Sequence, residues 1–183
     1  MSTFQEVTHP QENTKDTPDI CTPEATDGVA VHNLIRNSAF LDDNSLYCYL
    51  LVCSHFASTS AIARLDDDIV GVISGYIIPE RPDTLFVWQV AVDARMRRRG
   101  LARAMLDHIL QGNACRQQVR YIETTVTADN AASRRLFSSL AKHLDCRIEE
   151  HPGFDRRRHF LNLHASEPLL RLGPFFPNQG ERT

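Results

Sequence analysis

Apolar residues recur at helical spacing in four segments of the chain, and runs rich in β-branched and aromatic residues lie between these segments. Val31, Leu34 and Ile35 share one face of the first expected helix. The cap signal Thr22-Pro23-Glu24 would start this helix, and Asn37 would end it. Further helices are expected over residues 46–51, 101–110 and 131–144, and strands over residues 58–65, 69–78, 84–92, 119–127, 146–150 and 159–164. This order predicts an α/β fold of mixed α+β type, with a central mixed sheet flanked by helices.

The length of the chain fits one domain with a tail at each end. Its 183 residues are 42% hydrophobic and 23% charged, which allows one core of ordinary size. Residues 1–19 are polar and rich in Thr, Glu, Asp, Asn and Pro, so we expect a flexible N-terminal tail. The folded domain is expected over residues 20–172. Residues 173–183 hold two prolines and two glycines and predict an irregular C-terminal tail.

The balance of charge and the cysteines argue against several classes of protein. The chain has 20 Lys and Arg against 23 Asp and Glu, a net charge of −3, which argues against a general nucleic-acid binder. No apolar stretch is long enough for a membrane span or a signal peptide. Five scattered cysteines favour a reducing cytoplasm over a disulfide framework. Cys48, Cys53 and His55 would fall on different sides of a helix, so no metal site is expected there.

A basic loop connects the strand that ends near Val92 to the helix that starts near Gly100. Free backbone N–H groups at a helix start bind anions, and a glycine lets the backbone approach a ligand closely. The loop and the first helical turn carry five arginines: Arg95, Arg97, Arg98, Arg99 and Arg103. A solvated basic turn or a nucleic-acid patch would show the same composition. The strand–loop–helix context favours a phosphate site.

The loop matches the motif Arg/Gln-x-x-Gly-x-Gly/Ala as Arg97-Arg98-Arg99-Gly100-Leu101-Ala102. A second motif follows the next expected strand as Asp129-Asn130-Ala131-Ala132-Ser133-Arg134-Arg135-Leu136-Phe137. With both motifs and this order of strands, the sequence resembles the GNAT superfamily of acyl-CoA-dependent N-acetyltransferases. The resemblance implies the GNAT fold, in which the sheet splays to form a wedge for acetyl-CoA.

The same resemblance implies where acetyl-CoA would bind. Its pyrophosphate would lie on the N–H groups of residues 97–102, and its pantetheine arm would pair like an extra strand with the backbone near Val90 and Val92. Asn130 would contact the cofactor, cap the following helix, or do both. Phe137 departs from the pattern, because many GNAT enzymes have a tyrosine there that protonates the leaving thiolate. Either another group gives the proton, or the thiolate leaves unassisted.

Three further segments narrow the resemblance: residues 41–51, 82–92 and 123–127. The segment Phe-Val-Trp-Gln-Val-Ala-Val, together with Asn-Ser-Leu-Tyr, resembles the sequences of the L-2,4-diaminobutyrate acetyltransferases of ectoine synthesis. This similarity extends over roughly residues 20 to 172. It implies transfer of an acetyl group to the 4-amino group of L-2,4-diaminobutyrate, giving N4-acetyl-L-2,4-diaminobutyrate.

Five residues would then form the acceptor site. Asp42 and Glu167 would bind the ammonium groups of the acceptor as charge-assisted partners. Tyr47, Trp88 and His164 would form the walls, with the tryptophan ring attractive to cations. Several of these residues also have an ordinary alternative: a core tryptophan, a loop-capping aspartate, or solvated side chains near the end of the chain.

In the implied reaction the amine attacks acetyl-CoA directly in a ternary complex. Glu167 is the leading candidate for the base, ahead of Asp42 and Tyr47, and a backbone N–H near Val90 would stabilise the oxyanion. We expect a cytoplasmic homodimer that needs no metal and binds neither nucleic acid nor membrane. A GNAT enzyme for another small amine or a peptide amine, and a non-catalytic acyl-CoA-binding module, are the alternatives.

Overall fold

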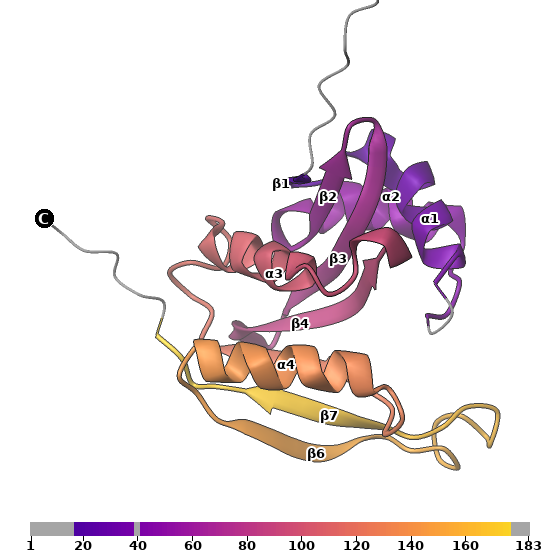
Figure 1. The fold of residues 1–183 in the computed structure, drawn as a ribbon. Helices are drawn as coiled ribbons and strands as arrows, with labels where there is room; N and C mark the ends of the chain where they lie inside the picture. The colour runs from indigo at the N-terminus through magenta and orange to yellow at the C-terminus, as the bar shows by residue number, and fades with distance from the viewer. Residues whose placement is uncertain (1–16, 39–40, 177–183) are drawn as a thin grey trace, which may run out of the picture.

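The β-branched and aromatic runs of the sequence form a mixed sheet, and the amphipathic segments form helices on its two faces (Figure 1). The computed structural model describes residues 17–38 and 41–176. The strands are β1 (Asp19–Cys21), β2 (Ala61–Leu65), β3 (Asp68–Ile78), β4 (Arg81–Val92), β5 (Tyr121–Thr125), β6 (Ile148–Phe154) and β7 (Glu167–Leu172). The helices are α1 (Gly28–Arg36), α2 (Leu46–His55), α3 (Leu101–Gln111) and α4 (Ala131–His143), with short 3₁₀ turns η1 (Ala25–Asp27), η2 (Ala57–Thr59) and η3 (Ala94–Met96).

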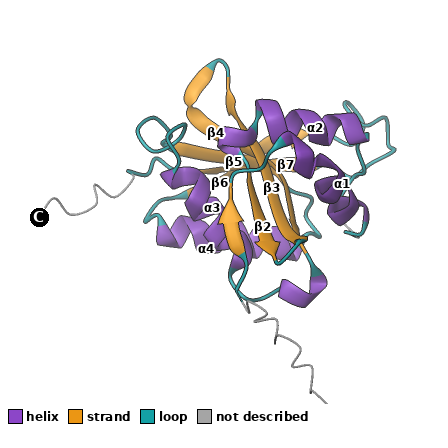
Figure 2. Cartoon of the chain, turned by 90° about the horizontal axis from the view of Figure 1, so that it is seen from above, coloured by secondary structure: helices purple, strands orange, loops and turns teal. Residues whose placement is uncertain are grey.

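The strands lie in the order β1-β2-β3-β4-β5-β7-β6, and only β4 and β5 run parallel to each other. Side chains alternate along the strands and supply a core on each face of the sheet. In β2, Ala61 and Ala63 belong to the larger core with Met105 of α3, whereas Ile62 belongs to the smaller core with Val31 of α1. Figure 2 shows the strands between these groups of helices. The predicted α/β fold with a central mixed sheet is confirmed.

Strands β4 and β5 are joined at one end only. They pair over three positions: Thr84–Tyr121, Leu85–Ile122 and Phe86–Glu123. Just beyond, Trp88 is an extra residue in β4, because the register with β3 shifts from Gly75–Val87 to Ser74–Gln89. Such a bulge bends a strand. Beyond Phe86, β4 stays paired with β3 but has no pairing with β5, so the predicted splay of the sheet is confirmed.

Two expected elements differ in the structure. Residues 159–164, which we expected to form a strand, form turns, and the last strand is β7. Leu161 and Asn162 have φ angles of 50° and 68°, a left-handed conformation that a strand does not allow. The first α-helix begins at Gly28 rather than at the predicted cap signal, because Glu24 and Asp27 form a capping box around η1.

The two predicted tails lie mostly outside the described residues, which exclude residues 1–16 and 177–183. Strand β1 was not expected from the sequence. It pairs with β2 at the edge of the sheet, with Asp19 opposite Arg64 and Cys21 opposite Ile62. Within the described ranges, every helix is too short or too polar to cross a membrane.

Candidate active site

A cleft of about 780 Å³ opens where β4 and β5 separate. Its walls come from the loop between α1 and α2, from β3 and β4, from β5 with the loop after it, from the start of α4, and from the segment between β6 and β7. Seven of the predicted site residues line it: Asp42, Trp88, Val90, Asn130, Phe137, His164 and Glu167. The separation of the strands therefore brings four of the five predicted acceptor residues and part of the predicted acetyl-CoA site into one cavity.

The open edge of β4 presents backbone groups to this cleft. The N–H of Gln89 points toward β3, where the Oγ of Ser74 accepts it at 3.2 Å. Backbone groups alternate along a strand, so the N–H and C=O groups of Val90 and Val92 point the opposite way, toward the gap beside β5. The carbonyl of Val92 accepts a hydrogen bond from Nε of Arg97 at 3.2 Å. Val90 is thus placed to offer its N–H to a ligand.

Glu167 begins β7 and faces Thr125 of β5. One carboxylate oxygen of Glu167 accepts a hydrogen bond from the Thr125 hydroxyl at 2.6 Å, and the other lies 3.9 Å from Nε2 of His164. The ring of Phe160 packs against the ring of His164, with 4.8 Å between the centroids. The Glu167 side chain is 24% exposed, so it is held in place and still reachable from the cleft. A carboxylate held in this way can accept a proton from a ligand.

Asp42 lies on the opposite side of the cleft, in the loop between α1 and α2. The side-chain amide of Gln89 donates to the backbone carbonyl of Asp42 at 3.1 Å. Two residues further on, the N–H of Asn44 donates to the hydroxyl of Tyr49 at 3.3 Å. These bonds fix the loop beside β4. No residue that the structure describes forms a hydrogen bond or an ion pair with the carboxylate of Asp42. This carboxylate is therefore available to a cationic ligand.

The two predicted aromatic wall residues differ in their placement. Trp88 lines the cleft from β4 and is 43% exposed. Tyr47 lies in the first turn of α2, is 67% exposed and does not line the cleft. Trp88 is therefore placed to contact a ligand, whereas the catalytic and binding roles of Tyr47 stay predictions.

Helix α4 borders the cleft with Asn130 and Phe137. The side chain of Asn130 accepts a hydrogen bond from the N–H of Ser133 at 3.1 Å, so the predicted helix cap is confirmed. Phe137 is buried in the larger core and also lines the cleft. Its ring gives the cleft an apolar boundary that offers no proton.

The basic loop follows Val92 and leads into α3. Gly100 precedes the helix with φ of 77°, and no side chain caps the first turn, so the N–H groups there have no side-chain partner. Arg98 also has a positive φ, 64°. A Cβ added to Gly100 would meet nothing within 4 Å, which shows open space over the turn. The turn therefore offers polar backbone groups and room for an anion.

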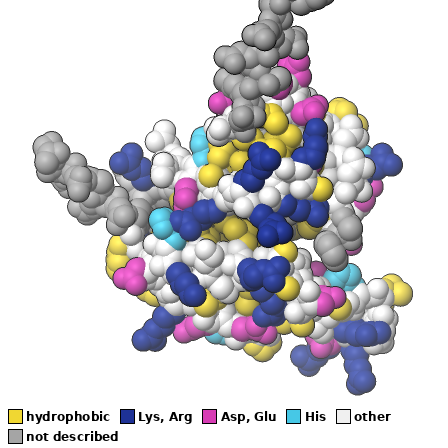
Figure 3. Space-filling model, viewed as in Figure 1, with side chains coloured by type: hydrophobic (Ala, Val, Ile, Leu, Met, Phe, Trp, Pro, Cys, Tyr) yellow, Lys and Arg dark blue, Asp and Glu magenta, His cyan; other side chains and the backbone are white. Residues whose placement is uncertain are grey.

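The arginines of this loop are not equivalent. Arg95 pairs with Asp93 at 3.0 Å, and Arg103 pairs with Asp107 at 3.1 Å. Arg97, Arg98 and Arg99 pair with no carboxylate in the part of the chain that the structure describes. Figure 3 shows Lys and Arg side chains gathered across the middle of this face, in the region of α3 and α4. Residues 97–102 and Val92 lie outside the lining of the cleft and extend the site along the surface.

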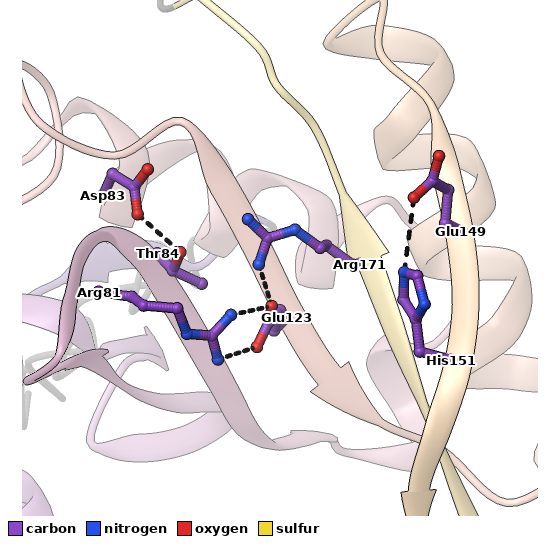
Figure 4. A network of polar contacts seen from close by, with 7 residues as sticks. All are labelled: Arg81, Asp83, Thr84, Glu123, Glu149, His151 and Arg171. Carbon is purple, nitrogen blue, oxygen red and sulfur yellow. Dashed lines mark hydrogen bonds and ion pairs between the residues drawn. The ribbon is translucent and has the colours of Figure 1, made fainter.

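At the closed end of the β4–β5 pair, Glu123 joins three strands (Figure 4). Its side chain is only 2% exposed. Arg81 of β4 binds both carboxylate oxygens, at 2.5 and 2.7 Å, and Arg171 of β7 binds one of them while its guanidinium lies over the ring of Tyr121. Burial alone would raise the pKa of Glu123, but the hydrogen bonds from Arg81 and Arg171 outweigh it and lower the pKa below the ordinary value.

The cysteines and acidic residues supply neither a reactive thiol nor a metal site in the described structure. All five cysteines are unpaired, and none of them lines the cleft. Burial raises the pKa of Cys53 and of Cys115 to about 11, so both thiols stay protonated at neutral pH. Among the residues described, no group of three or more His, Cys, Asp or Glu side chains is arranged to hold a metal ion.

Part of the lining of the cleft was not predicted from the sequence. Thr124 and Thr125 of β5, Gln89 of β4, and Phe154 and Phe160 beyond them were not predicted as site residues. One signal was available for Gln89, because a glutamine inside an otherwise apolar strand is unusual. The threonines and phenylalanines reach the cleft only through the pairing of distant strands, which no local pattern shows.

Comparison with known proteins identifies the family of the chain. A model of the acetyltransferase (GNAT) family matches residues 29–141. The chain belongs to the GNAT family of acetyltransferases. It is 50% identical over 153 residues to the L-2,4-diaminobutyric acid acetyltransferase of Methylotuvimicrobium alcaliphilum, which covers 84% of this chain and 88% of that protein. The corresponding Streptomyces coelicolor protein is 44% identical over 153 residues, covering 83% and 90%.

Solved structures agree as well. The chain resembles diaminobutyrate acetyltransferase EctA from Paenibacillus lautus, in complex with its substrate L-2,4-diaminobutyric acid and coenzyme A. The TM-score is 0.84 at 43% identity, covering 92% of this chain and 100% of that chain. The ribosomal-protein-S18-alanine N-acetyltransferase of Escherichia coli shares the fold, with a TM-score of 0.63 at 18% identity and coverage of 91% and 98%. The predicted GNAT fold and family are confirmed, and GNAT acetyltransferases use acetyl-CoA.

Proposed function

We propose that this chain transfers the acetyl group of acetyl-CoA to the 4-amino group of L-2,4-diaminobutyrate, giving N4-acetyl-L-2,4-diaminobutyrate in ectoine biosynthesis. The observation that carries the proposal is the cleft, which joins the open strand edge at Val90 to one carboxylate on each side, Asp42 and Glu167. An acceptor with two ammonium groups matches two such carboxylates. The Paenibacillus lautus complex with this substrate supports the assignment.

Acetyl-CoA fits the surfaces beside the cleft. The N–H groups of residues 97–102 at the start of α3, and the arginines among them that pair with no described carboxylate, would hold its pyrophosphate. Its pantetheine arm would pair with the backbone of Val90 and Val92 and take the place beside β4 that β5 leaves open. Asn130 and Phe137 would border the arm from α4. This arrangement places the thioester near the N–H of Val90.

The acceptor amine must lose a proton before it attacks, because an amine with a pKa of about 10 is mostly protonated at neutral pH. Glu167 would take this proton, directly or through water, while Thr125 holds one of its oxygens. The nitrogen then bonds to the acetyl carbonyl carbon, and the N–H of Val90 stabilises the oxyanion. When the carbon–sulfur bond breaks, its electron pair leaves on sulfur, and the nitrogen gives up its extra proton to water, so that the products are an amide and a thiolate. Phe137 gives no proton, and a thiol pKa of about 8.5 lets the thiolate leave unassisted.

Transfer would be direct, in a ternary complex. A covalent route would need a reactive cysteine beside the thioester. Cys48 and Cys53 of α2 do not line the cleft, and burial raises the pKa of both thiols. The acetyl group would therefore pass to the amine without an acyl-enzyme.

We also propose that the chain forms a homodimer in the cytoplasm. Every residue of the edge strand β6 is exposed, and Leu161 and Leu163 beyond it are 74% and 89% exposed, which suits self-association as a homodimer. The five unpaired cysteines suit a cytoplasmic location. Residues 20–172 would form the acetyltransferase domain between the tails at 1–19 and 173–183.

The test uses the purified full-length chain with acetyl-CoA and follows release of the coenzyme A thiol with a thiol-reactive dye. We expect turnover with L-2,4-diaminobutyrate and far less with ornithine, lysine or a peptide that has a free N-terminal amine. Turnover with the peptide but not with diaminobutyrate would contradict the proposal and favour a peptide acetyltransferase. Binding of acetyl-CoA without turnover of any amine would favour a non-catalytic module.

A further inference from the structure

Gln89 has a polar atom that the fold leaves without a partner. Its side chain lines the cleft from β4 and the residue is only 5% exposed. The amide nitrogen donates to the carbonyl of Asp42 at 3.1 Å. The amide oxygen is buried and accepts no hydrogen bond from any residue that the structure describes, and no other buried side-chain polar atom among these residues lacks a partner.

The orientation of this amide follows from its neighbour. A backbone carbonyl only accepts hydrogen bonds, so the amide nitrogen of Gln89 must face Asp42 and the amide oxygen must face away from it. Buried acceptors in proteins are almost always paired, and an unpaired one beside a binding cleft calls for a donor. The donor that this cleft is expected to receive is an ammonium group.

The polar groups of the cleft fall into two sets on opposite sides. Glu167, Thr125 and His164 come from β5, β7 and the turn before β7. Asp42 and Gln89 come from the loop before α2 and from β4. The reacting amine of the acceptor must reach the base, which is Glu167. The second amine then lies at the other set, where the carboxylate of Asp42 has no described partner either.

We propose that Gln89 determines acceptor specificity: its amide oxygen accepts an N–H of the ammonium group that does not react, beside the carboxylate of Asp42. This inference rests on the proposed function and deepens it. An ammonium group has three N–H donors, so one carboxylate does not satisfy it. A site that contains a buried acceptor for a substrate N–H rejects an analogue without that group, because the acceptor then stays unpaired. The enzyme should therefore prefer L-2,4-diaminobutyrate over 4-aminobutyrate, which lacks only the 2-amino group.

The experiment compares kcat/KM for these two acceptors in the wild-type chain and in Gln89→Met, which keeps the length of the side chain but removes its hydrogen-bonding groups. We expect the preference for diaminobutyrate to fall about 10- to 100-fold, the value of a hydrogen bond to a charged group. The kcat/KM for 4-aminobutyrate should change less than about threefold. A ratio of two substrates cancels any loss of folded enzyme. Ser74→Ala is the matched control, because it removes the acceptor for the backbone N–H of Gln89 outside the cleft and should leave the preference unchanged.

A second comparison separates direct contact from an effect through Asp42. In an Asp42→Ala background, Gln89→Met should still lower the preference for diaminobutyrate. No further change in that background would overturn the proposal and leave Gln89 only as a support for the loop. Equal losses for both acceptors in the single variant would overturn it as well. Wild-type enzyme that acetylates neither acceptor would contradict the proposed function itself, a result distinct from a wild-type preference that Gln89→Met does not alter.

Discussion

The two ends of the β4–β5 pair differ in what their charged side chains contact. At the closed end, three residue pairs join the strands, and the buried carboxylate of Glu123 binds Arg81 and Arg171 (Figure 4). At the open end, β4 continues past Trp88 with no pairing to β5, and the charged groups Asp42 and Glu167 lie at the edges of a cleft. At the closed end the charged side chains bind each other and hold the strands together. At the open end the two carboxylates face the cleft, where a ligand can reach them.

This difference explains how a sheet can open without losing its order. The pairing of β4 with β5 stops at Glu123, and the next residues of β5, Thr124 and Thr125, already line the cleft. Charges that bind each other at the closed end fix the point where the strands part.

The largest effect is expected at the open end. Glu167→Gln would remove the proposed base but keep the hydrogen bond to Thr125 within reach. We expect kcat to fall about 100- to 10,000-fold, as for other general bases, because the acceptor amine stays protonated. Steady-state kinetics with diaminobutyrate measure this, and thermal denaturation checks that the variant folds. A loss smaller than tenfold would assign the proton transfer to another group.

The corresponding change at the closed end should act on stability. Glu123→Gln leaves two arginines around a neutral amide. We expect the free energy of unfolding to fall by about 2 to 3 kcal/mol, less than for a fully buried pair because Arg81 is 43% exposed. Urea denaturation measures it. Glu150→Gln breaks the exposed Arg134–Glu150 pair and serves as the control, with an expected change below about 1 kcal/mol.

The same carboxylate predicts a pH dependence. The pKa of Glu123 is lowered in the folded chain, so its contribution is complete above the unfolded pKa of about 4.3 and is lost as the pH falls through the lower folded value. The stability difference between wild type and Glu123→Gln should therefore be constant at neutral pH and shrink in acid. Urea denaturation at a series of pH values follows it. A stability difference that grows in acid would show that folding does not lower the pKa of Glu123.

A smaller effect is expected at Gly100, at the end of the basic loop. Gly100→Ala places a methyl group in open space but in a left-handed conformation that costs about 1 to 2 kcal/mol. The methyl group would also keep the backbone away from the pyrophosphate. We expect the KM for acetyl-CoA to rise about threefold to tenfold while the KM for diaminobutyrate stays unchanged. Equal changes in both KM values would show that the loop does not hold the phosphates.

The smallest effect is expected from the cysteines. Burial raises the pKa of Cys53 to about 11, so very little of this thiol is ionised at pH 8. Treatment of the native enzyme with iodoacetamide should change kcat less than about twofold. Mass spectrometry of the treated chain identifies the modified cysteines. Inactivation that follows modification of Cys48 or Cys53 would instead support an acyl-enzyme.

The elements that local pattern determines were predictable from the sequence. The strand that ends at Val92, the helix after Gly100 and the helix cap at Asn130 all appear in the structure, because each depends on neighbouring residues. The turn region 159–164 was predicted wrongly. Leu161 and Leu163 alternate with polar residues as in a strand, but the Asp155 carboxylate accepts the N–H groups of Arg157 and Arg158 and starts a turn.

The arrangement of the site depends on contacts between distant residues, and the sequence could not show it. The family resemblance named Glu167 and His164 without the strand and turn that place them. Glu123 binds Arg81 and Arg171 from two other strands, and nothing in its own segment predicts either contact. The bulge at Trp88 depends on the register with β3 rather than on its own segment.

In the proposed function, the cleft holds the two amines of the acceptor at different ends and directs one of them to the thioester. Nuclear magnetic resonance of the product made by the wild-type chain from acetyl-CoA and L-2,4-diaminobutyrate tests it most directly. We expect a single product with the acetyl group on the 4-amino nitrogen. A product acetylated on the 2-amino nitrogen, or a mixture of the two, would contradict it.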